Sequence, residues 1–448
     1  KMDKKINKKY SILNLILIYI ITRFITYNFF EIYSNPDVIR PGWHILELKF
    51  LTTDLIDSIL HLHSQPPLWN FIVGIFAKIS DGDLLKTSFF LNIFNYLISI
   101  GIIYYTYKIL INLGFKERTC FYLVIIFIIF NPNVFFYENI TFYNHILAFL
   151  FTNLVWLIIL YLKNNNHLIE FFIYFNISVQ SLIWAGIHPI ILVFFFIFIS
   201  YKKKSILKFN KSLIYFFICF ILSISPMIKN KIIFNKFSTS TWLGINIAST
   251  MTNLDDKQCL YQIIYPDYYE EYKNKYDREI EHPVARISKN GLRNSVSQIL
   301  LSDKCLEKSI DQIKKTPDHY IKGRIVAFIV SHSKFAFEYI YLSPINFNFR
   351  FLKEFLDNNK KTKKIKQTLI IIYMILFYYF FIKKIFLHKK YYSDFYGLIF
   401  FIYLFCILIS HLFNGYEQER MMYQFQVLHI IFISNIFRLI LSRKQTSN

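Results

Sequence analysis

Long apolar stretches alternate with short polar ones along most of the chain, and this pattern predicts membrane-spanning helices. About 20 mostly apolar residues are enough for a helix to cross a bilayer. Ten stretches of roughly this kind follow one another: 11–30, 84–107, 118–137, 140–162, 167–184, 187–201, 209–229, 367–387, 393–413 and 422–441. The sequence therefore predicts an all-α polytopic membrane protein with ten transmembrane helices.

The basic residues between these stretches predict the orientation, because cytoplasmic loops carry an excess of Lys and Arg. With the Lys-rich N-terminus in the cytoplasm, alternation places most basic groups there. These groups are Lys108, Lys116, Arg118, Lys163, the run 202–204, Lys383, Lys384, Lys389, Lys390, Arg443 and Lys444. The basic cluster at 360–366 falls on the outer side, which leaves open an eleventh crossing at 323–343. That stretch carries four charged or His residues, so ten spans remain the prediction.

This topology divides the chain into three parts. Residues 1–229 form a transmembrane module interrupted by the first polar segment, 31–83; residues 230–365 form the second polar segment; and residues 366–448 return to the membrane. Both polar segments are expected on the outer side. The second of them contains Cys259 and Cys305, which an oxidising exterior would allow to form a disulfide. Two free thiols are an equal alternative.

The first polar segment contains a double-proline corner, His63-Ser64-Gln65-Pro66-Pro67-Leu68-Trp69-Asn70. Two consecutive prolines cannot sit inside a regular helix, but they can begin one. We therefore expect a helix over 66–80, too short to cross the membrane. The amphipathic stretch 43–62 before it is expected to lie along the membrane surface, with Asp54 and Asp57 on its solvated face.

The composition agrees with a membrane protein, since 54% of the 448 residues are hydrophobic. The net charge of +22 would suggest nucleic-acid binding in a soluble protein. Here the lysines lie in short loops that encode topology, so no nucleic-acid partner is expected, and membrane lipids are the expected surroundings.

Several acids at the predicted outer membrane boundary are candidates for chemistry. Glu31 and Asp37 follow the first span, and Glu138 lies two turns before His145. A carboxylate in such a position can act as a general base or bind a metal. Each of them can equally be a solvated or interfacial side chain, and the residues alone leave both interpretations open.

Basic and polar groups at the same boundary could hold an anionic head group. His63 and Gln65 lie at the double-proline corner, and His188 lies in the turn between two spans. Arg420, next to Glu419, precedes the last span and has the planar guanidinium that suits a bidentate grip on phosphate. A Glu–Arg surface pair is the alternative for these last two residues.

The layout resembles the GT-C superfamily of membrane glycosyltransferases, in particular the glycosyltransferase 39, or protein O-mannosyltransferase-like, branch and the aminoarabinose–lipid A transferases. The resemblance rests on acids after the first span, on the sequence 63–68 where that branch has a His-Pro-Pro-Leu motif, on the long segment after the seventh span with its stretch 235–244, and on Glu/Arg residues 417–420. Ser64-Gln65 is an insertion relative to that motif.

The resemblance implies transfer of a sugar, with inversion, from a polyprenyl-phosphate donor to a lipid, glycan or protein acceptor. Asp37 or Glu31 would be the base, and Glu138 would orient the acceptor or share a divalent cation such as Mg²⁺ or Mn²⁺ with Asp37. The donor phosphate would lie near Arg420, with His63, Gln65, His188 and Glu419 lining the site. The expected location is a bacterial inner membrane with the site facing the periplasm, or alternatively the endoplasmic reticulum.

Two other functions fit the same topology. One is another lipid-linked glycan enzyme, of the O-antigen polymerase or ligase kind. The other is a lipid or glycan transporter without chemistry, although the chain shows neither internal repeats nor a series of intramembrane charges.

Overall fold

The computed structural model describes residues 10–30, 45–202, 211–251, 259, 268–286, 294–333, 360–387, 390–413 and 422–446. All regular structure within these ranges is helical. The prediction of an all-α fold is confirmed for this part of the chain.

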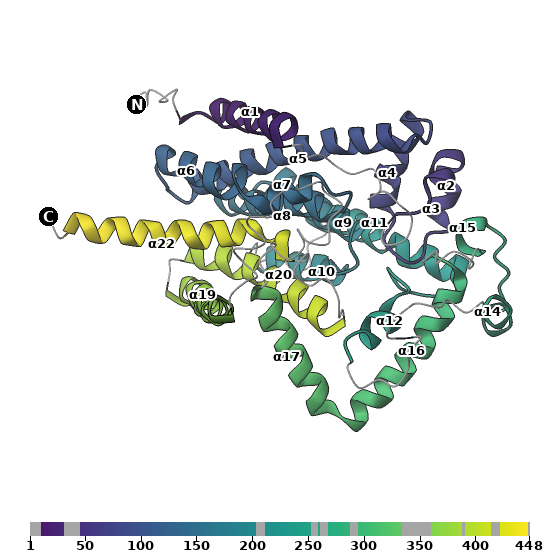
Figure 1. Ribbon diagram of the computed structural model, residues 1–448. Helices are drawn as coiled ribbons and strands as arrows, with labels where there is room; N and C mark the ends of the chain where they lie inside the picture. The colour runs from purple at the N-terminus through teal and green to yellow at the C-terminus, as the bar shows by residue number, and fades with distance from the viewer. Residues whose placement is uncertain are drawn as a thin grey trace.

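Long helices occupy the predicted apolar stretches and pack into a bundle. They are α1 (Ile12–Phe30), α5 (Leu84–Asn112), α8 (Asn144–Asn164), α9 (His167–Ser181), α10 (Ile190–Lys202), α11 (Lys211–Phe234), α19 (Lys360–Leu387), α20 (Lys390–Phe413) and α22 (Gln426–Thr446). Helix α5 packs against α8, α8 against α9, and α9 against α11, so one row of packed helices runs through the bundle (Figure 1).

Five helices in the described part of the chain are long and apolar enough to cross a membrane. They are Ile12–Phe29, Leu84–Asn112, Asn144–Asn164, Lys211–Phe234 and Ser393–Leu412. Several apolar side chains of α1, including Leu13, Leu17 and Phe24, are exposed, as expected of a surface that faces lipid rather than water. These features define an all-α integral membrane protein. The number of crossings and their direction remain predictions from charge, and of the stretch 323–343 only the part up to Ser333, at the end of α17 (Pro317–Ser333), is described.

The predicted span 118–137 is not one continuous helix. It consists of α6 (Glu117–Val124), a π-helical turn (Ile125–Ile129) and the short α7 (Pro132–Glu138). Asn131-Pro132 causes the break, because proline lacks the N–H that would continue the ladder and restricts the residue before it. The Asn131 side chain caps α7 by accepting a hydrogen bond from the Asn133 N–H at 3.0 Å.

The first polar segment contains three short helices. The amphipathic stretch 43–62 contains two helices, α2 (Leu48–Thr53) and α3 (Leu55–Leu60), which separate at Asp54. The Asp54 carboxylate caps α3, as acids commonly do at a helix start. Helix α4 (Leu68–Ile79) begins directly after the double proline and has 12 residues, as predicted for a helix too short to span.

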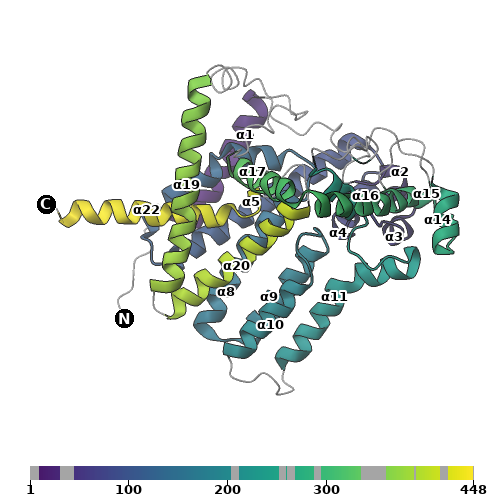
Figure 2. The same ribbon diagram turned by 90° about the horizontal axis from the view of Figure 1, so that it is seen from below.

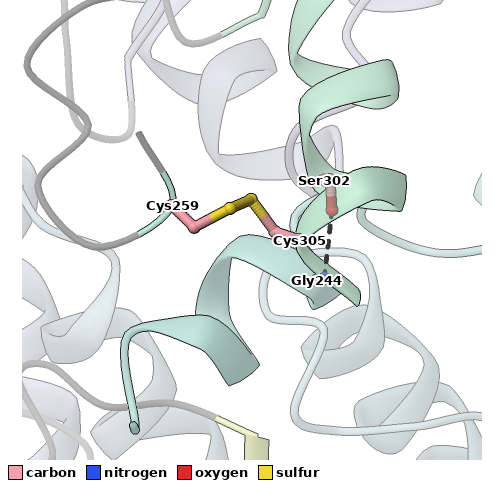
Figure 3. Close-up of a disulfide and its surroundings, with 4 residues drawn as sticks. All are labelled: Gly244, Cys259, Ser302 and Cys305. Atoms are coloured by element: carbon pink, nitrogen blue, oxygen red, sulfur yellow. Dashed lines mark hydrogen bonds between the residues drawn. A yellow bond between two sulfur atoms is a disulfide. The ribbon is translucent and has the colours of Figure 1, made fainter. Parts of the chain in front are cut away.

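The second polar segment folds into further short helices held by a disulfide. They are α12 (Leu243–Ala248), α14 (Tyr269–Tyr276), α15 (Pro283–Arg286) and α16 (Val296–Lys315), followed by α17. Cys259 and Cys305 are bonded, which decides between the two alternatives that the sequence left open (Figure 3). A disulfide in this segment is typical of a compartment more oxidising than the cytosol.

Most helices of the two polar segments gather at one end of the bundle, whereas α17 packs against α19 and α20. In Figure 1, α2, α3, α4, α14, α15 and most of α16 lie at the right, while the first turn of α1 and the last turn of α22 lie at the left. Figure 2 shows the same separation from below, with α11 leading toward this end. The two polar segments, far apart in sequence, therefore form one unit.

Candidate functional site

A buried ion pair between Arg23 and Glu138 lies inside the bundle. Nε of Arg23 donates to Oε2 of Glu138 at 2.6 Å, and Nη2 donates to Oε1 at 3.0 Å, which gives a bidentate pair. Neither side chain is exposed by more than 6%. The guanidinium also lies over the Phe135 ring, 3.7 Å from its centroid, and Nη1 donates to the Ile129 carbonyl at 2.9 Å.

Two hydroxyl groups complete the surroundings of the Glu138 carboxylate. Tyr19 donates to Oε1 at 3.0 Å, and Ser99 donates a short hydrogen bond to the same oxygen. Helices α1, α5 and α7 thus converge on one carboxylate. Four N–H or O–H donors satisfy it, which is the condition under which a buried charge is tolerated.

His145 extends this network toward the start of the last helix. Its Nε2 lies 2.8 Å from the Ser99 hydroxyl and 3.2 Å from the Asn95 carbonyl, which can only accept. Nε2 therefore carries the hydrogen, and Nδ1 accepts from the Tyr423 hydroxyl at 2.8 Å. A chain of hydrogen bonds thus runs from Tyr423 through His145 and Ser99 to Glu138.

These contacts bear on the expected role of Glu138. A metal or an acceptor hydroxyl would have to displace donors that already hold the carboxylate, so the geometry favours a structural role. Its part in catalysis or metal binding stays a prediction. Arg23 was missed by the sequence analysis, although a single arginine in an apolar span is itself a sign of a buried acidic partner.

The double-proline corner is the second polar centre. The ring of His63 is fully buried, with Nδ1 2.7 Å from the Thr241 hydroxyl and a T-shaped contact with the Phe234 ring. The Thr241 N–H donates to the His63 carbonyl at 3.1 Å. The corner is thus bonded through both its backbone and its side chain to the stretch before α12.

Asn294 joins the corner to the start of α16. Its Oδ1 accepts from the backbone N–H groups of His63 at 2.9 Å and Ser64 at 3.0 Å, and its Nδ2 donates to the His61 carbonyl at 2.9 Å. Lys229, near the end of α11, donates a short hydrogen bond to the Leu62 carbonyl. The bonds from Asn294 hold the first polar segment against the second, and the bond from Lys229 holds it against α11.

Burial makes His63 an uncharged side chain. Loss of hydration, together with the nearby positive charge of Lys229, lowers the pKa of His63 to about 3. Its Nε2 is buried and has no hydrogen-bond partner among the described residues. A neutral imidazole with one satisfied nitrogen anchors the corner, and it would contact a phosphate only through that second nitrogen.

The other predicted site residues are placed as follows. Gln65 is half-buried at the corner, and His188 is half-buried in the turn between α9 and α10. Nδ1 of His188 accepts from the Ile190 N–H at 3.3 Å, and burial lowers the pKa of this histidine. Glu31, Asp37, Glu419 and Arg420 lie outside the described residues, so the structure does not test the predicted base or the predicted phosphate-binding arginine.

We expect replacement of Asn294 by alanine to destabilise the unit formed by the two polar segments by about 2 kcal/mol. The change leaves two buried N–H groups of the corner, those of His63 and Ser64, without an acceptor. Thermal unfolding of the purified protein in detergent measures the effect. Asn164→Ala, at an exposed asparagine at the end of α8, is the matched control and should change the stability little. Equal losses in both variants would contradict this account.

The fold and these two polar centres define an all-α integral membrane protein whose polar segments form one disulfide-bonded unit at an end of the bundle. Comparison with known proteins adds no family: no protein-family model, no curated protein and no solved structure matches the chain. The function must therefore be argued from the chain itself.

Proposed function

We propose that the protein is a membrane glycosyltransferase that moves a sugar from a polyprenyl-phosphate donor to an acceptor at the face where its two polar segments meet. The observation that carries the proposal is the meeting of the double-proline corner with the second polar segment through Thr241 and Asn294. The resemblance in sequence involves the same two segments. His63 is 178 residues from Thr241 and 231 residues from Asn294 along the chain.

The surroundings of the corner support a rigid site. Its prolines and the bonds from Asn294 hold the backbone in place before any substrate arrives. Substrate binding would therefore need little further ordering of this backbone. The exposed apolar surface of the bundle provides a path by which a polyprenyl chain could reach this end of the molecule while remaining in the bilayer. Asp37 or Glu31 would deprotonate the acceptor, and Arg420 would neutralise the leaving phosphate.

Transfer of a radiolabelled sugar from polyprenyl phosphate in membranes tests the proposal. Asp37→Asn or Glu31→Gln, whichever removes the base, should lower the rate about 10²-fold or more. Asp81→Asn is the matched control, because Asp81 is an exposed acid of the same polar segment with a positive φ that asparagine tolerates. It should leave the rate unchanged.

Two outcomes would contradict the proposal in different ways. Full activity in both acid variants would exclude them as the base while leaving the transferase activity intact. Absence of transfer by the wild-type protein, together with protein-dependent movement of the lipid-linked sugar across reconstituted vesicles, would identify a transporter instead.

A further inference from the structure

Three potential metal ligands come together where the two polar segments meet. Asp54, Asp57 and His282 each offer one ligand atom, and these atoms all lie within 4.8 Å of one another. The two carboxylates come from the α2–α3 junction and the first turn of α3, whereas the imidazole comes from the residues before α15. Among the described residues no other group of three or more His, Cys, Asp or Glu side chains is this close.

The two carboxylates have little else to compensate their charge. Both are exposed, and in the described part of the chain neither pairs with a lysine or arginine, despite the net charge of +22. Two like charges at this separation repel each other. A bound cation would remove that repulsion, and the exposed position leaves room for water ligands to complete its coordination.

His61 packs against the imidazole of the cluster. Its ring stacks on that of His282, with centroids 4.3 Å apart and an angle of 5° between the planes. Its Nδ1 lies 2.9 Å from the Asp57 carbonyl, which can only accept, so Nδ1 carries a hydrogen and this bond fixes the His61 ring beside α3.

From these observations we propose that Asp54, Asp57 and His282 bind a divalent cation, with water completing its coordination, and that the cation clamps the first polar segment to the second. Two carboxylates with one imidazole suit Zn²⁺ better than Mg²⁺ or Ca²⁺, which prefer oxygen alone. Tetrahedral Zn²⁺ with ligands at about 2 Å needs ligand atoms about 3.3 Å apart. Small rotations of the exposed carboxylate groups would bring the ligand atoms, which lie within 4.8 Å of one another, to this separation.

Nδ1 of His282 accepts a hydrogen bond from the Val284 N–H at 3.3 Å. A cation would either replace this bond at Nδ1 or bind Nε2 with the ring hydrogen on Nδ1. The proposal does not depend on glycosyl transfer, since it concerns binding and the attachment of two segments to each other.

Zinc binding by the purified, full-length protein tests the proposal. The protein should carry an affinity tag without histidine, be freed of metal with EDTA and be titrated with ZnCl₂ in detergent. We expect one zinc per chain at this site, and each of Asp54→Asn, Asp57→Asn and His282→Gln should weaken binding at least tenfold. Asn at position 54 keeps the helix cap, so loss of binding there cannot be attributed to loss of α3.

Asp318→Asn combined with His319→Gln is the matched control, because both residues are exposed at the start of α17. The control should bind zinc as the wild type does. Zinc should also raise the unfolding temperature of the wild type and the control, but not of the three variants, as expected when a ligand binds only the folded state. Absence of binding at millimolar zinc, or equal binding by all three variants and the wild type, would overturn the proposal.

Discussion

Replacement of Arg23 by methionine is expected to destabilise the protein by about 4 kcal/mol, because it leaves the buried carboxylate of Glu138 without its cation. The remaining donors, Tyr19 and Ser99, would then have to hold a full negative charge in an apolar bundle. The charge cannot escape to water, since the side chain of Glu138 is completely buried. The loss should appear in thermal unfolding in detergent.

A double replacement distinguishes the loss of the whole ion pair from the loss of one charged partner. Arg23→Met combined with Glu138→Leu removes both charges, and it should recover much of the stability that Arg23→Met loses. Arg118→Met is the matched control, since Arg118 is exposed at the start of α6 and should tolerate the change. Equal stability of Arg23→Met and the control would show that the ion pair does not support the fold.

The same variants test the expected catalytic role of Glu138. If Glu138 only holds α1, α5 and α7 together, the stable double variant should retain the transferase activity that we propose. If Glu138 orients the acceptor, the double variant should be stable but inactive. The measurement therefore distinguishes a structural carboxylate from a catalytic one without relying on a single variant that may fail to fold.

The positions of the helices could be predicted from the sequence because they follow from local properties. Apolar length placed the long helices, and the missing N–H of proline placed the start of α4 after Pro67. The same rule applied to Asn131-Pro132 would have divided the stretch 118–137, where apolar length alone predicted one span. The prediction of one continuous helix was wrong because it considered the hydrophobicity of the stretch and not the effect of Pro132 on the backbone.

The contacts within the polar centres could not be predicted, because they join residues far apart in the chain. Arg23 and Glu138 are 115 residues apart, and His63 and Asn294 are 231 apart. When such a residue is considered alone in the sequence, an ordinary structural or solvent-exposed role explains it as well as a functional one. Only the fold shows that the acid singled out as a catalytic candidate already has an arginine partner.

The double-proline corner gains a more definite meaning from these contacts. Its sequence suggested one wall of a substrate site, with His63 shaping the pocket or binding the donor phosphate. The structure places the His63 ring in the interior, where it holds the two polar segments together. A substrate site at this end of the bundle would then be supported by the corner, and the proposed zinc clamp would lie beside it, since His61, which stacks on His282, belongs to the same stretch of chain.

Replacement of Gly244 by alanine should separate α12 from α16 and destabilise the second polar segment by about 3 kcal/mol. A Cβ at this position would lie 1.7 Å from the Ser302 carbonyl oxygen and 2.8 Å from the Leu306 nitrogen. Both are backbone atoms of α16, so no side-chain rotation can relieve the overlap. The same close approach allows the Gly244 N–H to donate to the Ser302 hydroxyl at 3.0 Å, beside the disulfide (Figure 3).

Gly323 provides the matched control for this prediction. It lies in α17, and a Cβ there would meet no atom within 4 Å. Alanine at 323 should stabilise the helix by about 0.5–1 kcal/mol, because glycine is the poorer helix former. Unfolding temperatures should therefore move in opposite directions in the two variants. The disulfide should also be reduced faster by an added thiol in Gly244→Ala, since α16 carries Cys305. A Gly244→Ala protein with wild-type stability and wild-type reduction would mean that α12 and α16 do not pack as closely as the structure requires.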